Sequence, residues 1–145
     1  MNKKILCSIV LVSLTALTAI AGVDFSQNDY DKFLKGEKNL SETRLEGADF
    51  SCKNLAGYNF TNADLEGANF QNANLTGAIF EHTDLEKTKF QGANLTDANF
   101  YHADLEEANL KDAIIKGATF KNAELEYTTW TNGRICAEGS IGDCW

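Results

Sequence analysis

Large apolar residues recur at every fifth position of this chain from Leu40 to Trp130, nineteen times without a gap. A period of five matches neither the 3.6 residues of an α-helix nor the two residues of a β-strand. A helix would spread these side chains around its whole circumference, and a flat strand would point them alternately to opposite faces. The chain is therefore predicted to turn a corner about every five residues, so that each large side chain points toward a common axis.

Small residues follow the same period. Alanine lies two positions before the large residue in twelve of the nineteen units, and threonine does so in four more. This pairing predicts two inward positions of different volume in each unit. The other three positions are mostly polar, as expected for side chains that face solvent.

The units carry a family resemblance. Residues 63–77 read ADLEG, ANFQN and ANLTG, which resembles the A-(D/N)-(L/F)-x-x repeat of the pentapeptide-repeat proteins. The resemblance covers residues 38 to about 132. It implies an all-β fold, a right-handed quadrilateral β-helix with twenty residues per coil and about 4.5–5 coils.

The sequence can be compared with a twenty-residue coil by reading every twentieth large residue. One column consists of leucines, Leu45, Leu65, Leu85, Leu105 and Leu125. A second column is aromatic after its first member, Leu40, Phe60, Phe80, Phe100 and Phe120. Leucine and phenylalanine largely alternate from one five-residue unit to the next, and this alternation alone would generate the same columns. The pattern therefore supports a coil with an even number of sides without fixing that number at four. We expect these side chains to stack on one another along the axis of the solenoid.

The segment before the repeats predicts a cap. Within residues 22–37, Ser26 followed by Asp29 resembles a capping box, and Gly36 is suited to end a helix. We expect a short amphipathic helix that closes the first coil. The alternative is a disordered linker, against which the aromatic content of the segment argues.

Residues 133–145 predict a second cap, a glycine-rich loop that contains Cys136 and Cys144. A disulfide between these two cysteines is expected to close the loop over the last coil. Cys52 lies about four coils from Cys136, roughly 20 Å at strand spacing, which is beyond the reach of a disulfide, about 7 Å between Cα atoms. Cys52 is therefore expected to be a free thiol or to form an intermolecular bond.

Residues 1–21 predict a signal peptide. Lys3 and Lys4 precede an apolar run that ends in Ala19-Ile20-Ala21, which is an A-x-A cleavage pattern. The run is short for a membrane-spanning helix, although an uncleaved anchor is the alternative. Cleavage would remove Cys7 and leave no membrane span. The expected location is the periplasm or the medium.

The chain is acidic, with 21 Asp and Glu against 13 Lys and Arg and a formal net charge of −8. Loss of Lys3 and Lys4 with the signal peptide would make the net charge −10. Direct binding to nucleic acid or to an anionic membrane surface is therefore disfavoured.

The twenty-residue register places many of these acids on one side of the predicted coil. Two ladders of carboxylates flank the leucine column, and together we call them the acidic face: Glu46, Asp64, Glu66, Asp84, Glu86, Asp104, Glu106, Glu124 and Glu126. Three interpretations are open, namely a solvated surface, a docking surface for a basic partner, or a ladder for divalent cations such as Ca²⁺. Calcium requires six to eight oxygens around one point, and a flat ladder offers fewer.

Other chemistry is sparse. His82 and His102 occupy equivalent outward positions one coil apart, but zinc requires three or four ligands, and a chance surface pair is the simpler interpretation. We find no nucleophile–base arrangement, no phosphate-binding loop and no pair of differently tuned carboxylates. The sequence predicts neither catalytic residues nor a metal or cofactor site, and hence no enzyme.

The sequence therefore favours a non-enzymatic exported β-solenoid that binds a protein with a basic surface through the acidic face, or that has a structural role. The resemblance implies an alternative, because some pentapeptide-repeat proteins mimic DNA and bind DNA gyrase, protecting it from quinolones. The export signal and the short rod argue against that alternative. The sequence specifies no oligomeric state.

Overall fold

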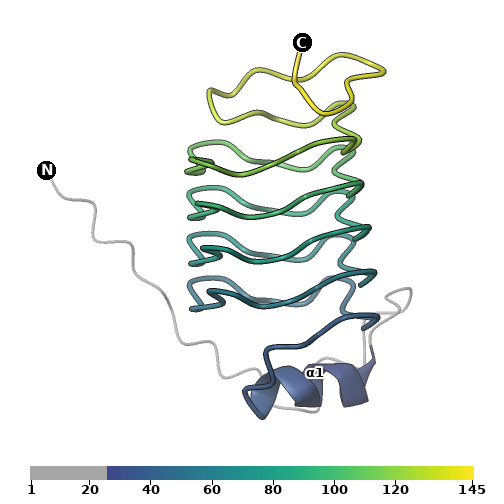
Figure 1. The fold of residues 1–145 in the computed structure, drawn as a ribbon, viewed down its shortest axis with the longest axis vertical. Coiled ribbons are helices and arrows are strands. Elements are labelled where there is room, and N and C mark those ends of the chain that lie inside the picture. The colour runs from purple at the N-terminus through teal and green to yellow at the C-terminus, as the bar shows by residue number, and fades with distance from the viewer. Residues whose placement is uncertain (1–25) are drawn as a thin grey trace, which may run out of the picture.

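The computed structural model of the chain describes residues 26–145. It consists of one helix, α1 (Gln27–Leu34), followed by a rod of stacked coils, with the last residues lying across the far end of the rod (Figure 1). The predicted signal peptide, residues 1–21, lies outside the described residues. No helix within residues 26–145 has the length and apolar character needed to cross a membrane.

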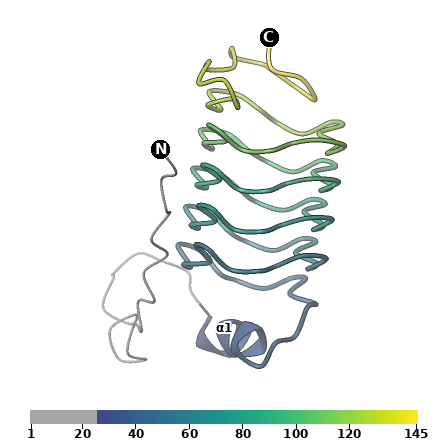
Figure 2. The same ribbon diagram turned by 90° about the vertical axis from the view of Figure 1, so that its left-hand side faces the viewer.

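Backbone pairing sets the coil at twenty residues. Parallel bridges join each paired residue to the one twenty positions later, from Asn39 and Asn59 at the start to Asn109 and Thr129 at the end. In one such unit, the Asn59 N–H donates to the Lys38 carbonyl and the Phe60 N–H donates to the Ile79 carbonyl. Hydrogen bonds thus run along the rod axis in both directions, between the stacked coils that Figure 2 shows. With one large residue every five positions, each coil has four sides.

Each side is too short to form an extended strand. The pairing within residues 26–145 consists of isolated bridges, because one bridging residue precedes each large residue and a turn follows at once. The all-β prediction therefore holds for the pairing between coils, while regular strands are missing from the described part of the chain.

The corners are β-turns with one left-handed residue each. In the turn that begins at Leu45, the Ala48 N–H donates to the Leu45 carbonyl at 3.0 Å, and Gly47 has a φ of 67°. The same position has a positive φ in every unit from Glu42 to Tyr127, and twelve of these residues are not glycine. A positive φ at the third turn residue is the signature of a type II turn. Side chains at this position point away from the core.

Leucine and phenylalanine columns fill the interior. Phe60, Phe80 and Phe100 are fully buried and stack with ring centroids 5.1 and 4.9 Å apart. The leucine column from Leu45 to Leu125 is likewise buried, as are the alanines and threonines two residues before each large side chain, with the exception of Ala118. The core is thus a continuous apolar column along the rod axis.

Helix α1 covers the first coil. The Ser26 hydroxyl accepts from the Asp29 N–H, which is the predicted capping contact, and the Ser26 N–H donates to the Arg44 carbonyl in the first coil. Phe33 packs edge-on against Phe50 at 5.0 Å. The predicted N-terminal helix is therefore present, and it closes the apolar column at this end.

The C-terminal loop covers only half of the opposite end. A disulfide joins Cys136 and Cys144, as predicted, with 4.9 Å between their Cα atoms. The loop pairs in antiparallel fashion with two sides of the last coil, through Glu124 and Ile141 and through Thr129 and Ile135. The other two sides have no such pairing, although Gly142 of the loop lies close to Phe120 and Asn122 on one of them.

Two expectations about single residues are wrong. Cys52 is disulfide-bonded rather than free. Ile115 is only partly buried, although it follows the inward period, because the C-terminal loop does not cover its side of the coil.

Candidate functional site

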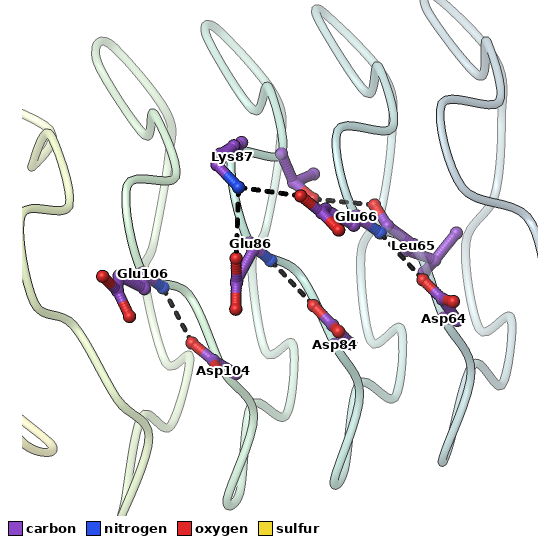
Figure 3. A network of polar contacts seen from close by, with 9 residues as sticks. Asp64, Leu65, Glu66, Asp84, Glu86, Lys87, Asp104 and Glu106 are labelled. Carbon is purple, nitrogen blue, oxygen red and sulfur yellow. Dashed lines mark hydrogen bonds and ion pairs between the residues drawn. The ribbon is translucent and has the colours of Figure 1, made fainter. Parts of the chain in front are cut away.

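The nine carboxylates of the acidic face lie on one side of the rod in the register that the sequence predicts. Asp64, Asp84, Asp104 and Glu124 are bridged to one another in succession. The glutamates lie two residues further on, and their backbones are linked from coil to coil, as where the Gly67 N–H donates to the Glu86 carbonyl. The carboxylates therefore form two parallel ladders, of which Figure 3 shows three rungs.

The aspartate ladder supports the turns. The Glu66 N–H donates to Asp64 Oδ1 at 3.3 Å, and the Glu106 N–H donates to Asp104 Oδ1 at 2.9 Å (Figure 3). Asparagine makes the same contact on other sides of the rod, for example where the Thr76 N–H donates to Asn74 Oδ1. This is the local side-chain bond to the backbone that favours Asp and Asn in turns. One oxygen of each of these aspartates is thus used by the fold.

The glutamate ladder has no such structural role, but a lysine interrupts its middle. Lys87 Nζ lies 2.8 Å from Glu66 Oε1 and 3.3 Å from Glu86 Oε2 (Figure 3). Lys87 occupies the left-handed turn position at which Gly67 lies one coil earlier. Its ammonium group offsets the negative charges of Glu66 and Glu86. The acidic face therefore has a part in which glutamates are paired with a lysine and a part in which they are not.

The unpaired part lies toward the C-terminal end. Within residues 26–145, the acids Glu106, Glu124 and Glu126 take part in none of the ion pairs. Tyr127, which is exposed on the same side, has a raised pKa because of the charge on Glu138, together with partial desolvation and the charge on Glu126.

Two carboxyl groups of the acidic face have raised pKa values. Desolvation raises the pKa of the Asp84 carboxyl, and the neighbouring Asp64, Glu86 and Asp104 add to this rise. The pKa of Glu106 is also raised, by partial desolvation and then by Glu126 and Glu86. Hydrogen bonds from Lys87 to Glu66 and Glu86 raise the pKa of Lys87. Like-charge repulsion within the ladders thus contributes to the raised pKa values of Asp84 and Glu106.

The first rung differs from the others. Arg44 takes the place of the aspartate in the first coil and is bridged to Asp64. The Arg44 N–H also donates to Asp29 Oδ2 in helix α1 at 3.2 Å. This end of the acidic face is therefore part of the contact between the rod and its cap.

The two histidines are neighbours, as the register requires. The rings of His82 and His102 stack with centroids 5.1 Å apart, and Tyr101 packs edge-on against His102 at 4.3 Å. His102 Nε2 also lies 3.1 Å from the Asn122 amide nitrogen. In the described part of the chain, no group of three or more His, Cys, Asp or Glu side chains is arranged to hold a metal ion.

Sequence reasoning missed Lys87, Glu107 and Tyr127, which join the acidic face at its corner. These residues share one twenty-residue column with Gly47 and Gly67. The twenty-residue register alone is the signal that places them there. The column is difficult to recognise from the sequence because it begins with two glycines.

A family model described as a pentapeptide repeat region matches residues 53–130, more than half of the chain. No curated protein sequence matches the chain.

Among solved structures, the chain is similar to HetL, a pentapeptide repeat protein involved in heterocyst differentiation regulation from the cyanobacterium Nostoc sp. strain PCC 7120. The identity is 34%, over 67% of this chain and 51% of HetL, with a TM-score of 0.41. The chain therefore spans about half the length of HetL.

The chain is also similar to a pentapeptide repeat protein from the Arabidopsis thaliana thylakoid lumen, with 26% identity over 68% of this chain and 81% of that one and a TM-score of 0.33. QnrB1, a plasmid-mediated fluoroquinolone resistance protein, matches at 23% identity over 64% of this chain and 54% of QnrB1, with a TM-score of 0.42. On the strength of the repeat model and the twenty-residue pairing, the chain belongs to the pentapeptide-repeat family.

Proposed function

We propose that this protein is an exported, non-enzymatic binding module whose acidic face docks a protein with a basic surface. In this proposal the rod is a right-handed quadrilateral β-helix of about 4.5–5 coils, spanning residues 38–132 between caps at 22–37 and 133–145. One observation carries the proposal: Glu106, Glu124 and Glu126 have no cationic partner within residues 26–145, and the fold does not use their side chains for turns.

Retaining unpaired like charges on adjacent rungs is unfavourable for folding. A docking partner that brings lysine or arginine to these rungs would relieve the repulsion. Such complementarity acts mainly on the association rate and weakens as salt screens it, over a Debye length of about 8 Å at physiological ionic strength. The interaction is therefore expected to be salt-sensitive.

Export is supported by the Cys136–Cys144 disulfide, since disulfides persist in oxidising compartments. Cell fractionation followed by N-terminal sequencing tests this part. A mature chain that begins near Gly22 in the periplasm or medium is the expected result. Recovery of the uncleaved chain from the cytoplasm alone would contradict export.

The docking surface is tested by affinity capture with three forms of the full-length oxidised chain. These are the wild type, the Glu106→Lys/Glu126→Lys variant, and a matched Gln71→Lys/Gln91→Lys variant. The control alters a different side of the rod, where the Gln71 amide donates to Gln91. A partner retained by the wild type and the control and lost by the first variant supports the proposal. A partner retained equally by all three would remove the acidic face from consideration.

A second candidate, a DNA mimic that binds gyrase, is favoured by the spacing of the ladders. Two carboxylates per coil at a rise of about 4.8 Å give roughly one charge per 2.4 Å, compared with about one per 1.7 Å of duplex DNA. Lys87 reduces this density over two rungs. A supercoiling assay with purified gyrase and a quinolone distinguishes the candidates, because only the mimic protects gyrase.

A further inference from the structure

The last coil has an open backbone edge. We define the open edge as residues 113–122, the two sides with which the C-terminal loop forms no backbone bridge, although Gly142 of the loop lies close to Phe120 and Asn122 at the end of this segment. One coil earlier, Leu95, Asp97, Phe100 and His102 each donate a backbone N–H to the next coil. Their counterparts on the open edge are Ile115, Gly117, Phe120 and Asn122, and among residues 26–145 these four N–H groups donate to no backbone acceptor.

The open edge also exposes apolar side chains. Leu95 and Ala98 are 0% and 1% exposed, whereas Ile115 and Ala118, at the same positions one coil later, are only partly buried. Ile114 is 55% exposed, at an outward position that Asn54, Asn74 and Asn94 occupy in earlier coils. Ile135, in the adjoining loop, is 64% exposed. Unpaired donors and an uncovered core together are the features of a sheet edge that accepts a further strand.

The charge on this edge is opposite to that of the molecule as a whole. Residues 113–122 contain Lys116 and Lys121, both exposed, and no carboxylate. The closest acid in the coil below is Asp97, whose carboxylate lies against Gly117. An isologous contact between two copies of the edge would bring these lysines together. The lysines therefore favour an acidic occupant over a second copy of the chain.

We propose that the open edge binds an extended, acidic segment of a partner protein by adding it as a further coil side. Backbone hydrogen bonds to the four free N–H groups would supply affinity, apolar side chains of the segment would cover Ile115 and Ala118, and its carboxylates would pair with Lys116 and Lys121. This surface is separate from the acidic face. It would select an acidic partner, whereas the acidic face would select a basic one.

A defined probe is available from the repeat itself. The decapeptide AIIEGATFEN has the sequence of residues 113–122 with both lysines replaced by glutamate, and AIIKGATFKN is the unaltered sequence. A third peptide is the acidic one N-methylated at its second and seventh residues. In the rod, the N–H groups of Ile114 and Thr119 donate to the Ala93 and Ala98 carbonyls of the previous coil. By analogy, the N–H groups of the second and seventh peptide residues would donate to the Ala113 and Ala118 carbonyls, and N-methylation removes both donors.

Each peptide is titrated into the ¹⁵N-labelled full-length oxidised chain and followed by amide chemical shifts. We expect AIIEGATFEN to shift the amides of Ile115, Gly117, Phe120 and Asn122. We expect it to bind about ten-fold more tightly than AIIKGATFKN at low salt, a difference of about 1.4 kcal/mol. The Lys116→Glu/Lys121→Glu variant should reverse this preference, and N-methylation should abolish binding to the wild type.

Three outcomes would overturn the proposal. The first is no shift at a peptide concentration of about 1 mM, which corresponds to an affinity of about −4 kcal/mol. The second is equal binding of the acidic and basic peptides. The third is a shift of the same four amides with protein concentration in the absence of peptide, together with a dimer in analytical ultracentrifugation, which would assign the edge to a second copy of the chain.

Discussion

Lys87 and Glu66 form an ion pair between adjacent coils of the rod, with 2.8 Å between Nζ and Oε1. The pair joins residues 21 positions apart in the sequence, and it lies within a ladder of otherwise like charges. Lys87 also contacts Glu86 at 3.3 Å, so one ammonium group serves two rungs.

Lys87→Gln should lower the melting temperature at low ionic strength, because Glu66 and Glu86 would then repel each other without compensation. The difference from the wild type should shrink as salt is added, since Lys87 is exposed and the two glutamates are partly exposed to solvent. Thermal unfolding followed by circular dichroism at two salt concentrations measures this. Lys111→Gln, an equal charge change on another side, is the control, and an equal loss there would disprove a specific role for the pair.

Phe80→Ala should lower the free energy of unfolding by about 3–5 kcal/mol, as expected for an aromatic side chain removed from a close-packed core. Phe80 is fully buried between Phe60 and Phe100. Phe80→Leu, which resembles the neighbouring leucine column, should cost less. Urea denaturation measures both. A loss below about 1 kcal/mol for the alanine variant would be incompatible with an inward Phe80.

Gly67→Ala should destabilise the chain by about 1 kcal/mol through backbone conformation alone. Gly67 has a φ of 65°, and a Cβ at this position would meet no atom within 4 Å. Gly67→Asn should be tolerated better, since Asn adopts the left-handed region more readily and does so here at Asn62 and Asn72. Equal losses for the two variants in chemical denaturation would argue against the left-handed turn as the cause.

Stability should rise as the pH falls from about 7 to about 5. The folded-state pKa values of Asp84 and Glu106 are raised, so the folded chain binds protons at pH values where the unfolded chain is already ionised. This contribution is complete below the ordinary carboxyl pKa values, about 4, and is lost as the pH rises through the raised values.

The Asp84→Asn/Glu106→Gln variant is the control for this pH dependence, because it removes both titrations while keeping an acceptor for the Glu86 N–H. Melting temperatures across the pH range should change less in the variant than in the wild type. An identical pH profile would mean that other groups dominate.

Cys136→Ser/Cys144→Ser should cost about 2–3 kcal/mol, as estimated for a disulfide that closes a short loop. The loop is also held by the Leu125 N–H, which donates to the Ser140 carbonyl at 2.9 Å. Hydrogen exchange should therefore accelerate at Leu125 and at Cys136 in the variant, while amides near Phe70 stay protected. Uniform acceleration along the rod would show that the loop is a requirement for the whole fold.

The period of five determines the positions that face the core, because a large residue that faces solvent would break the apolar column. The register of twenty then places the outward residues, which is why the two ladders of the acidic face could be located from the sequence. The partial exposure of Ile115 could not be predicted. It depends on how far a glycine-rich loop with no repeat reaches across the last coil, and no periodic signal encodes that path.

Lys87 illustrates a different limit. The twenty-residue register places Lys87 in one column with Gly47 and Gly67. The ion pair with Glu66, however, requires the long lysine side chain to cross from one coil to the next, and lysine has many other conformations available. The left-handed turn residues were likewise not anticipated. Their common property is backbone conformation, while their side chains range from glycine to histidine and tyrosine.

The pairing of each residue with the one twenty positions away limits how such a chain can change in length. An insertion of five residues would keep every later leucine and phenylalanine inward, so the core would survive. It would also rotate all later outward columns by a quarter turn, placing Glu106 and Glu126 on a different side from Glu66 and Glu86. Only the gain or loss of a whole coil keeps a surface in line, so a functional face on this rod can be lengthened or shortened only in steps of twenty residues.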